Sequence, residues 1–252
     1  TYTSGNNTTK MYKSLQATLN KISSWCDEWG FKLSPTKSKC IIFTRSKKYN
    51  KINNTLYINN QAIKNEDTIK FLGIILDKQL NFNHHINYII DKSKKRLNLM
   101  RNLCGTSWGA SLHTLLIIYR TLIRSIIDYA SIVYINTSKT NKQKLDSLQY
   151  QALKIVCGSM TGSPLVALQN ETGELPLELN RHKQQLIYYA KVKSNTKHPS
   201  HDIIYYPPNT KFYNKPSLDL FTMQTDHIFK QQQWTIKTNN NTLDAPWSPN
   251  KI

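Results

Sequence analysis

The acidic side chains set the first limit on what this protein could catalyse. The 252 residues include only 15 Asp and Glu, and only Asp27-Glu28 and Glu66-Asp67 are adjacent. The first pair lies at the end of a predicted helix, and the second precedes a predicted strand. A two-metal phosphoryl-transfer centre needs carboxylates that converge on ions about 4 Å apart. The pattern predicts no metal site and no resident cofactor in this chain.

Histidine and cysteine offer little more. His84 and His85 could ligate a metal, but a helix start and a packing contact explain this pair better. No C-x-x-C occurs, and neither a zinc site nor a disulfide framework is indicated. We therefore expect reduced thiols and an intracellular protein. The cysteines are far apart in the sequence, at Cys26, Cys40, Cys104 and Cys157.

Positive charge is the dominant feature. Lys and Arg number 34, and the formal net charge is +19. Such an excess indicates a polyanionic partner or a polyanionic membrane surface. Basic side chains on two predicted helices could be ordinary solvated surface, but together with the whole-chain charge they favour phosphate binding. These candidates are Lys92, Lys94, Lys95, Arg96, Arg101, Arg120 and Arg124. The side chains of Lys94, Lys95, Arg101, Arg120 and Arg124 are expected to point away from the helical core. Because no apolar run approaches the 18 or so residues of a membrane span, no membrane association is expected.

These residues must be positioned by two kinds of structure, in succession. Period-two and continuous apolar patterns predict strands in the first third, and a 3.6-residue period predicts helices after Leu80. Asn59-Asn60 indicates a hairpin turn, and the run Ile69 to Leu76, which contains Gly73, predicts one fully buried strand. The predicted strands are 40–46, 55–63 and 69–76. The predicted helices are 8–30, 83–104, 110–135, 138–157 and 176–194. Gly30 is the expected C-terminal cap of the first, and Pro176 is the expected first-turn residue of the last. The expected apolar face of the second is formed by Ile86, Ile90, Ser93, Leu97, Met100 and Cys104. The fold class is therefore α+β.

Four stretches, in order, resemble one family. They are LQATLNKISSWCDEWGFKLSPTKSKCIIF, IKFLGIILDKQLNFNHHI, LIRSIIDYASIVY and SPLVALQNETGELPLELNRH. Each is similar to a segment of the reverse transcriptases of non-LTR retrotransposons of the jockey-like and I-type groups. This chain has Phe82 and Tyr134 where the family pattern has Trp, and Ala130 where it has Gly.

The resemblance implies an architecture. Residues 1–82 would be the trailing half of a polymerase palm, a helix with short antiparallel strands that ends in the primer-grip hairpin. Residues 83–195 would form a helical thumb with post-thumb helices, and 196–252 an irregular connector. Phe71, Leu72 and Gly73 would be the primer grip, where the glycine lets a sugar-phosphate backbone approach closely. Lys37, on a loop, would be a proton donor or charge stabiliser near the incoming nucleotide. Without the resemblance, Lys37 would be interpreted as part of a solvated turn.

The resemblance also implies an activity. The chain would belong to an RNA-directed DNA polymerase, gripping the primer terminus and clamping template–primer duplex. The family's aspartate pair and fingers would precede Thr1, so the fragment is expected to be inactive alone, with Mg²⁺ or Mn²⁺ serving the parent enzyme. An RNase H domain follows in some members. The expected partners are an RNA template, RNA/DNA duplex and the missing N-terminal fingers and palm. The family's setting is a cytoplasmic ribonucleoprotein and the nucleus.

Two other functions remain open from the residues. One is a basic nucleic-acid-binding module that never catalyses, and the other is a helical interaction protein whose charge only keeps it in solution. The salt dependence of nucleic-acid binding separates phosphate contacts from mere solubilising charge.

Overall fold

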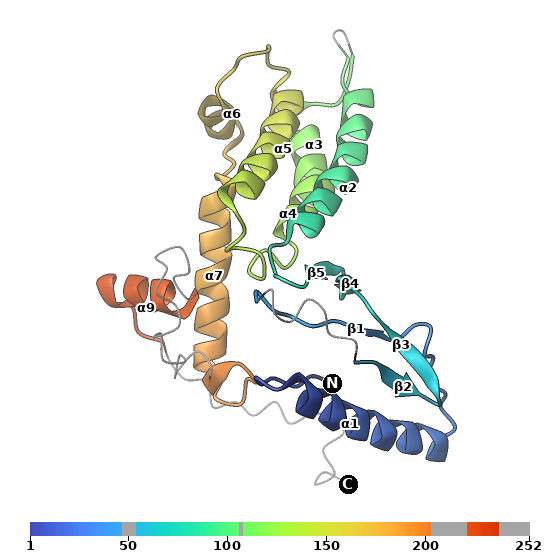
Figure 1. The fold of residues 1–252 in the computed structure, drawn as a ribbon. Helices are drawn as coiled ribbons and strands as arrows, with labels where there is room; N and C mark the ends of the chain where they lie inside the picture. The colour runs from blue at the N-terminus through green and yellow to red at the C-terminus, as the bar shows by residue number, and fades with distance from the viewer. Residues whose placement is uncertain (47–53, 106–107, 203–220, 237–252) are drawn as a thin grey trace, which may run out of the picture. The chain divides into compact units, whose positions relative to one another are not determined.

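The computed structural model describes residues 1–46, 54–105, 108–202 and 221–236. It divides into two compact units, Thr1–Asp91 and Lys92–Ile252. Helices and small sheets are mixed in the first unit, whereas the described part of the second unit is helical (Figure 1). This content is compatible with the predicted α+β class.

Helix α1, Thr8–Glu28, opens the first unit as predicted. Asn7 caps its start, because the side-chain Oδ1 accepts a hydrogen bond from the Lys10 N–H at 3.1 Å. The chain leaves the helix through Gly30, whose φ of +71° suits glycine. The Phe31 N–H then reaches back to the Cys26 carbonyl at 2.7 Å, so the predicted glycine cap is confirmed.

A three-stranded sheet of order β1-β3-β2 accompanies α1. Strands β2, Leu56–Ile58, and β3, Gln61–Asn65, are antiparallel around Asn59-Asn60. Those two asparagines have φ of 49° and 61°, so the predicted hairpin is confirmed. Tyr12 of α1 and three strand residues form one buried cluster, in which the strand residues are Leu56, Ile58 and Ile63.

The strand predicted over 40–46 is mostly wrong. Only β1, Lys39–Cys40, is a strand, and it pairs parallel to β3 rather than antiparallel. Beyond it the backbone bonds occur singly: the Glu66 N–H donates to the Cys40 carbonyl, and the Thr44 N–H donates to the Lys78 carbonyl, both at 2.9 Å. Isolated bonds of this kind do not make a ladder.

The apolar run at 69–76 is likewise not one buried strand. It folds into a two-stranded antiparallel hairpin, β4, Thr68–Phe71, and β5, Ile74–Asp77, with Phe71 opposite Ile74. The turn residues Leu72 and Gly73 both have positive φ, 45° and 81°. Since a turn divides the run, none of its eight residues is fully buried.

Helix α2, Asn83–Asn102, begins in the first unit and ends in the second. The predicted apolar face is confirmed at Ile86, Ser93, Leu97 and Met100, all buried. Ile89 is also buried and replaces the predicted Ile90, which is half-buried.

The helix predicted over 110–135 is shorter and irregular. It consists of α3, Leu112–Ile118, a π-helical segment η2, Tyr119–Arg124, and α4, Ser125–Asp128. After Asp128 the chain turns, with Ala130 at φ +52°. The Tyr134 hydroxyl donates to the Ile127 carbonyl and holds this turn against the helix end.

The remaining helices of the second unit are α5, Lys139–Cys157, α6, Leu165–Thr172, α7, Leu177–Ser194, and α9, Phe221–Gln231. Helices α5 and α7 were predicted, and α6 was not. The connector predicted over 196–252 contains α9, which packs Phe229 against Tyr189 of α7 at 5.2 Å between ring centroids. Residues 203–220 and 237–252 of that prediction lie outside the described residues.

Candidate nucleic-acid interface

The tip of the β4–β5 hairpin carries apolar side chains into solvent. Phe71 is 60% exposed and Leu72 is 73% exposed. Exposed apolar groups on a structured turn mark a surface that meets another molecule more often than scattered apolar residues do. The structure thus brings together the three residues predicted as a primer grip, Phe71, Leu72 and Gly73, at one turn.

Backbone geometry is sufficient to account for the glycine in this turn. A two-residue hairpin loop of type I′ requires positive φ at both central positions, and glycine adopts it without a steric cost. Leu72, at φ +45°, carries the strain of the same turn. The predicted approach of a sugar-phosphate backbone to Gly73 stays a prediction.

The hairpin is fastened to the start of α2. The Lys70 ammonium lies 3.2 Å from the Tyr88 hydroxyl and 4.7 Å from the Tyr88 ring centroid. On the facing strand, the Ile75 N–H points to His85 Nδ1 at 3.4 Å. Burial, with Lys70 nearby, lowers the pKa of His85, so the neutral ring accepts at Nδ1. Two side chains of one helix turn therefore orient both strands.

Asp77 builds the link from the hairpin to α2, and its part was missed from the sequence. Its carboxylate accepts backbone N–H groups from Gln79, Asn81 and Phe82 at 3.0, 3.1 and 2.7 Å. Three donors on one carboxylate fix the loop that starts the helix. An Asp just after a strand and before a helix start is the signal that could have revealed it.

Lys37 lies in a turn, as predicted. It is exposed, and the turn is closed by the Ser38 side chain and N–H, which both donate to the Ser34 carbonyl at 2.8 and 3.1 Å. This places an ammonium group on a rigid turn ahead of β1. The chemical role of Lys37 stays a prediction.

The basic residues of α2 lie on the solvent-facing side of the helix and on its two flanks. Lys92, Lys94, Lys95 and Arg101 are exposed, and Arg96 is partly exposed. At about 100° per residue, Lys94 and Arg101 share one flank of the helix, and Lys92 and Arg96 lie on the other. One nucleic-acid backbone would therefore contact one flank rather than the whole set.

Arg124 is not on a surface, and the expectation that its side chain points away from the core is wrong. Its side chain is 10% exposed, and its guanidinium binds Asp128 at 3.0 Å and Glu174 at 2.7 Å. Arg120 also binds Glu174, at 2.6 Å, and its side chain is 49% exposed. Asn180 completes the cluster by donating to Asp128 at 2.8 Å. Arg124 is thus committed to internal contacts, while Arg120 keeps an exposed part.

Burial raises the pKa of Asp128, although Arg124 beside it acts in the opposite direction. The cluster joins η2 and α4 to the segment between α6 and α7. It therefore holds the helical unit together, and we remove Arg124 from the residues that could bind phosphate.

No group of three or more His, Cys, Asp or Glu that could hold a metal ion occurs in the described part of the chain. His84 and His85 do not form such a group, and the cysteines are free thiols. The described helices also include none that is long and apolar enough to cross a membrane.

Known proteins that resemble this chain come from one class of mobile element. It is 26% identical over 147 residues to the RNA-directed DNA polymerase from mobile element jockey of Drosophila funebris, a match covering 58% of this chain and 16% of that protein. It is 24% identical over 171 residues, 64% of this chain and 17% of the relative, to the Pol polyprotein of the retrotransposable element R1 of Bradysia coprophila. A probable RNA-directed DNA polymerase from transposon BS of Drosophila melanogaster is 24% identical over 57% of the chain.

These comparisons confirm the resemblance to the RNA-directed DNA polymerases of non-LTR retrotransposons. The matches span about a sixth of the length of these relatives. No family model matches the chain, and no solved structure matches it either.

Proposed function

We propose that this homologue of jockey, R1 and BS polymerases is the segment of a retrotransposon reverse transcriptase that holds the primer terminus and the template–primer duplex. The observation that carries the proposal is the β4–β5 hairpin. It presents Phe71, Leu72 and Gly73 at one exposed turn, within the stretch that resembles the family's primer grip, and it leads directly into the basic helix α2.

The division of labour follows from the chemistry of each part. Exposed apolar side chains at the tip suit the sugar and base edges of a primer end, and exposed cations on one flank of α2 suit its phosphates. Lys94 and Arg101 are the pair that shares a flank, and Arg120 keeps partial exposure. Lys37 would oppose negative charge near an incoming nucleotide.

The metals of such a polymerase do not fit the described residues of this chain, because no cluster of carboxylates is present there. We therefore derive no nucleotide-transfer step from it and propose that the Mg²⁺ or Mn²⁺ ions belong to a preceding palm segment. The proposed partners are that segment, RNA template and RNA/DNA duplex. The proposed setting is a cytoplasmic ribonucleoprotein and the nucleus.

The experiment measures binding of the 252-residue chain to an RNA–DNA hybrid by fluorescence anisotropy across a salt series. Lys94→Gln with Arg101→Gln should weaken binding and lower the slope of log affinity against log salt by about 0.9 for each lost contact. Phe71→Ser with Leu72→Ser should weaken binding without changing the slope. Leu179→Ser, at a leucine of α7 that is 53% exposed, is the matched control and should change neither.

A hybrid affinity that does not respond to salt would contradict the proposal and favour the helical interaction protein. Primer extension by the chain alone, with Mg²⁺ or Mn²⁺, should give no incorporation; robust incorporation would contradict the assignment of the metals to another segment. If binding depends on salt but is unchanged by the two hairpin substitutions, the result would favour a basic nucleic-acid-binding module over a primer grip.

A further inference from the structure

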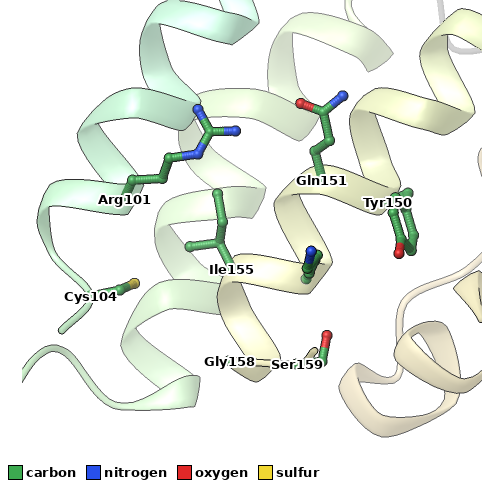
Figure 2. Close-up of a pocket in the computed structure, with 8 residues that line it drawn as sticks. Arg101, Cys104, Tyr150, Gln151, Ile155, Gly158 and Ser159 are labelled. Atoms are coloured by element: carbon green, nitrogen blue, oxygen red, sulfur yellow. The ribbon is translucent and has the colours of Figure 1, made fainter. Parts of the chain in front are cut away.

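A pocket of about 640 Å³ opens in the second unit between the last turn of α2 and the second half of α5. Figure 2 shows Arg101 extending from α2 toward α5, and most of the other lining residues lie on α5 or just after its end. The volume falls within the range of small-molecule sites. The lining residues are Arg101, Cys104, Tyr150, Gln151, Lys154, Ile155, Gly158 and Ser159.

The pocket is positively charged. It contains Arg101 and Lys154, and none of the lining residues that the structure describes is acidic. Arg101 donates one hydrogen bond to Asn98 Oδ1 at 2.6 Å, and Lys154 donates one to Thr161 Oγ1 at 3.0 Å. A guanidinium carries five N–H donors and an ammonium carries three. Both cations therefore keep donors for a ligand.

Ser159 supplies a polar group without an internal partner. Its Oγ is buried and finds no hydrogen-bond partner among the described residues. The Ser159 N–H donates to the Lys154 carbonyl at 3.1 Å, which fixes the residue after the left-handed cap at Gly158. A buried hydroxyl without a partner is costly, and a ligand oxygen in the pocket would satisfy it.

The two cations have a plainer explanation, since positive side chains near helix C-termini offset the helix dipole. One carbonyl at each of these helix ends accepts a backbone N–H: the Cys104 N–H donates to the Arg101 carbonyl at 3.2 Å, and the Gly158 N–H donates to the Ile155 carbonyl at 3.3 Å. Among the described residues, neither cation donates a hydrogen bond to these two carbonyls, and both line the pocket.

The rest of the lining is less polar. Tyr150 offers an aromatic ring and Ile155 an aliphatic wall, with the Gln151 amide at the edge. A ligand that combines a planar group with an anionic group fits this arrangement, and the space exceeds what a phosphate alone would need. Unpaired bases stack on aromatic side chains, whereas a duplex keeps its bases inside.

We propose that this pocket binds one unpaired nucleotide of a single-stranded nucleic acid. The phosphate lies between Arg101 and Lys154, the Ser159 hydroxyl donates to a phosphate oxygen, and the base stacks on Tyr150. The inference rests on the proposed function in that the chain binds nucleic acid, and it shares Arg101 with the proposed duplex contacts; the hairpin is not involved, and the pocket is tested at Lys154 and Ser159. A free nucleotide offers the same chemistry, and the experiment separates the two sources.

The test uses the full 252-residue chain and three probes: a uridine or thymidine oligomer, an RNA–DNA hybrid, and uridine monophosphate as a competitor. Lys154→Gln should weaken oligomer binding about tenfold and lower the salt slope by about 0.7. Ser159→Ala should weaken oligomer binding about threefold with the slope unchanged. Lys154→Arg should retain binding, because it keeps the charge.

Lys139→Gln is the matched control. It removes the same charge from an exposed lysine at the start of α5, about 22 Å from Lys154 along the helix. It should leave oligomer binding unchanged, and all variants should keep the urea unfolding midpoint of the parent within error.

Three results would overturn the proposal. The first is an unchanged oligomer affinity in Lys154→Gln and Ser159→Ala, which would leave the proposed function standing if the hybrid still binds with a steep salt slope. The second is an equal loss in Lys139→Gln, which would mean a general charge effect. The third is competition by uridine monophosphate at the oligomer's own concentration, which would assign the pocket to a free nucleotide. Absence of any nucleic-acid binding would refute the proposed function as well.

Discussion

The β4–β5 hairpin exposes apolar side chains, whereas the Arg124 cluster buries charged ones. This cluster consists of Arg120, Arg124, Asp128, Glu174 and Asn180. The hairpin exposes Phe71 and Leu72 to solvent. In the cluster, the side chain of Arg124 is only 10% exposed and that of Glu174 only 7% exposed. The apolar side chains at the hairpin tip do not contribute to a core, and the buried charged side chains of the cluster do not contribute to solubility. The difference separates an exposed apolar tip, for which we propose a partner, from a buried arginine that serves the fold.

Removing the acid at the centre of the cluster tests this contrast most strongly. Glu174→Ala should lower the free energy of unfolding by about 3 kcal/mol, because Arg120 and Arg124 lose their shared partner in a buried site. Urea unfolding measures it, with an unchanged slope against denaturant. Glu171→Ala, an exposed acid on α6, is the control and should change stability by less than about 0.5 kcal/mol. Equal effects would mean that the cluster is not a stabilising element.

The turn of the hairpin gives the next largest effect. Gly73→Val should cost about 1–2 kcal/mol, since a β-branched residue is strained at φ +81°. Gly73→Asn should cost less, because Asn tolerates the left-handed region. Both unfolding and hybrid binding are measured. If Gly73→Asn keeps its stability but loses hybrid affinity, a nucleic-acid backbone approaches this glycine; similar stability losses for Val and Asn would contradict the turn geometry.

The helical unit has a comparable turn that lacks a glycine. Ala130 has φ +52°, and it occupies the position where the resembling family has Gly. Ala130→Gly should raise stability by about 0.5–1 kcal/mol, the relief of strain minus the entropy cost of glycine. Ala167→Gly, an exposed position within α6, should instead lower stability by a similar amount. A destabilised Ala130→Gly chain would show that the methyl group packs usefully.

A smaller effect is expected from pH, because the stability of the hairpin region depends on the protonation state of His85. The pKa of His85 lies below its unfolded value of about 6.5 because the ring is buried, with Lys70 adding to the effect. The unfolded chain therefore binds the proton first, and stability should fall as pH drops from about 6.5 toward the folded pKa. Urea midpoints at pH 7.5, 6.5 and 5.5 measure it. His85→Gln should remove this part of the pH dependence; an identical profile would assign it elsewhere.

Much of the helical framework was predictable, because amphipathic periodicity and end signals agree. Helix α1 has Gly30 after its end, α7 has Pro176 before its start, and the Asn59-Asn60 pair marks a two-residue turn. Each of these signals is local, and each was confirmed.

The rest depended on contacts that periodicity does not report. The turn at Leu72-Gly73 was hidden because leucine is not a turn residue and the run on either side is apolar. Arg124 was placed on a surface because its partner Glu174 lies 50 residues away in sequence, although Asp128 four residues on was a usable signal. The pocket beside Arg101 depends on two helices that meet at their ends, which no single motif describes.

The π-helical segment Tyr119–Arg124 has a consequence for inherited variation. Its wider turn carries one more residue than an α-helix would, and the Ser125 N–H bonds to the Arg120 carbonyl, five residues back. Hydroxyls of Thr121 and Ser125 occupy carbonyls along the segment. Deleting a single codon here would remove the extra residue and restore a regular helix, so later residues would keep their facing. Deleting one codon within α5 would instead turn every later residue of that helix by about 100°. A chain shortened by one residue in the π-helical segment should therefore keep its helix packing better than a chain shortened by one residue in α5.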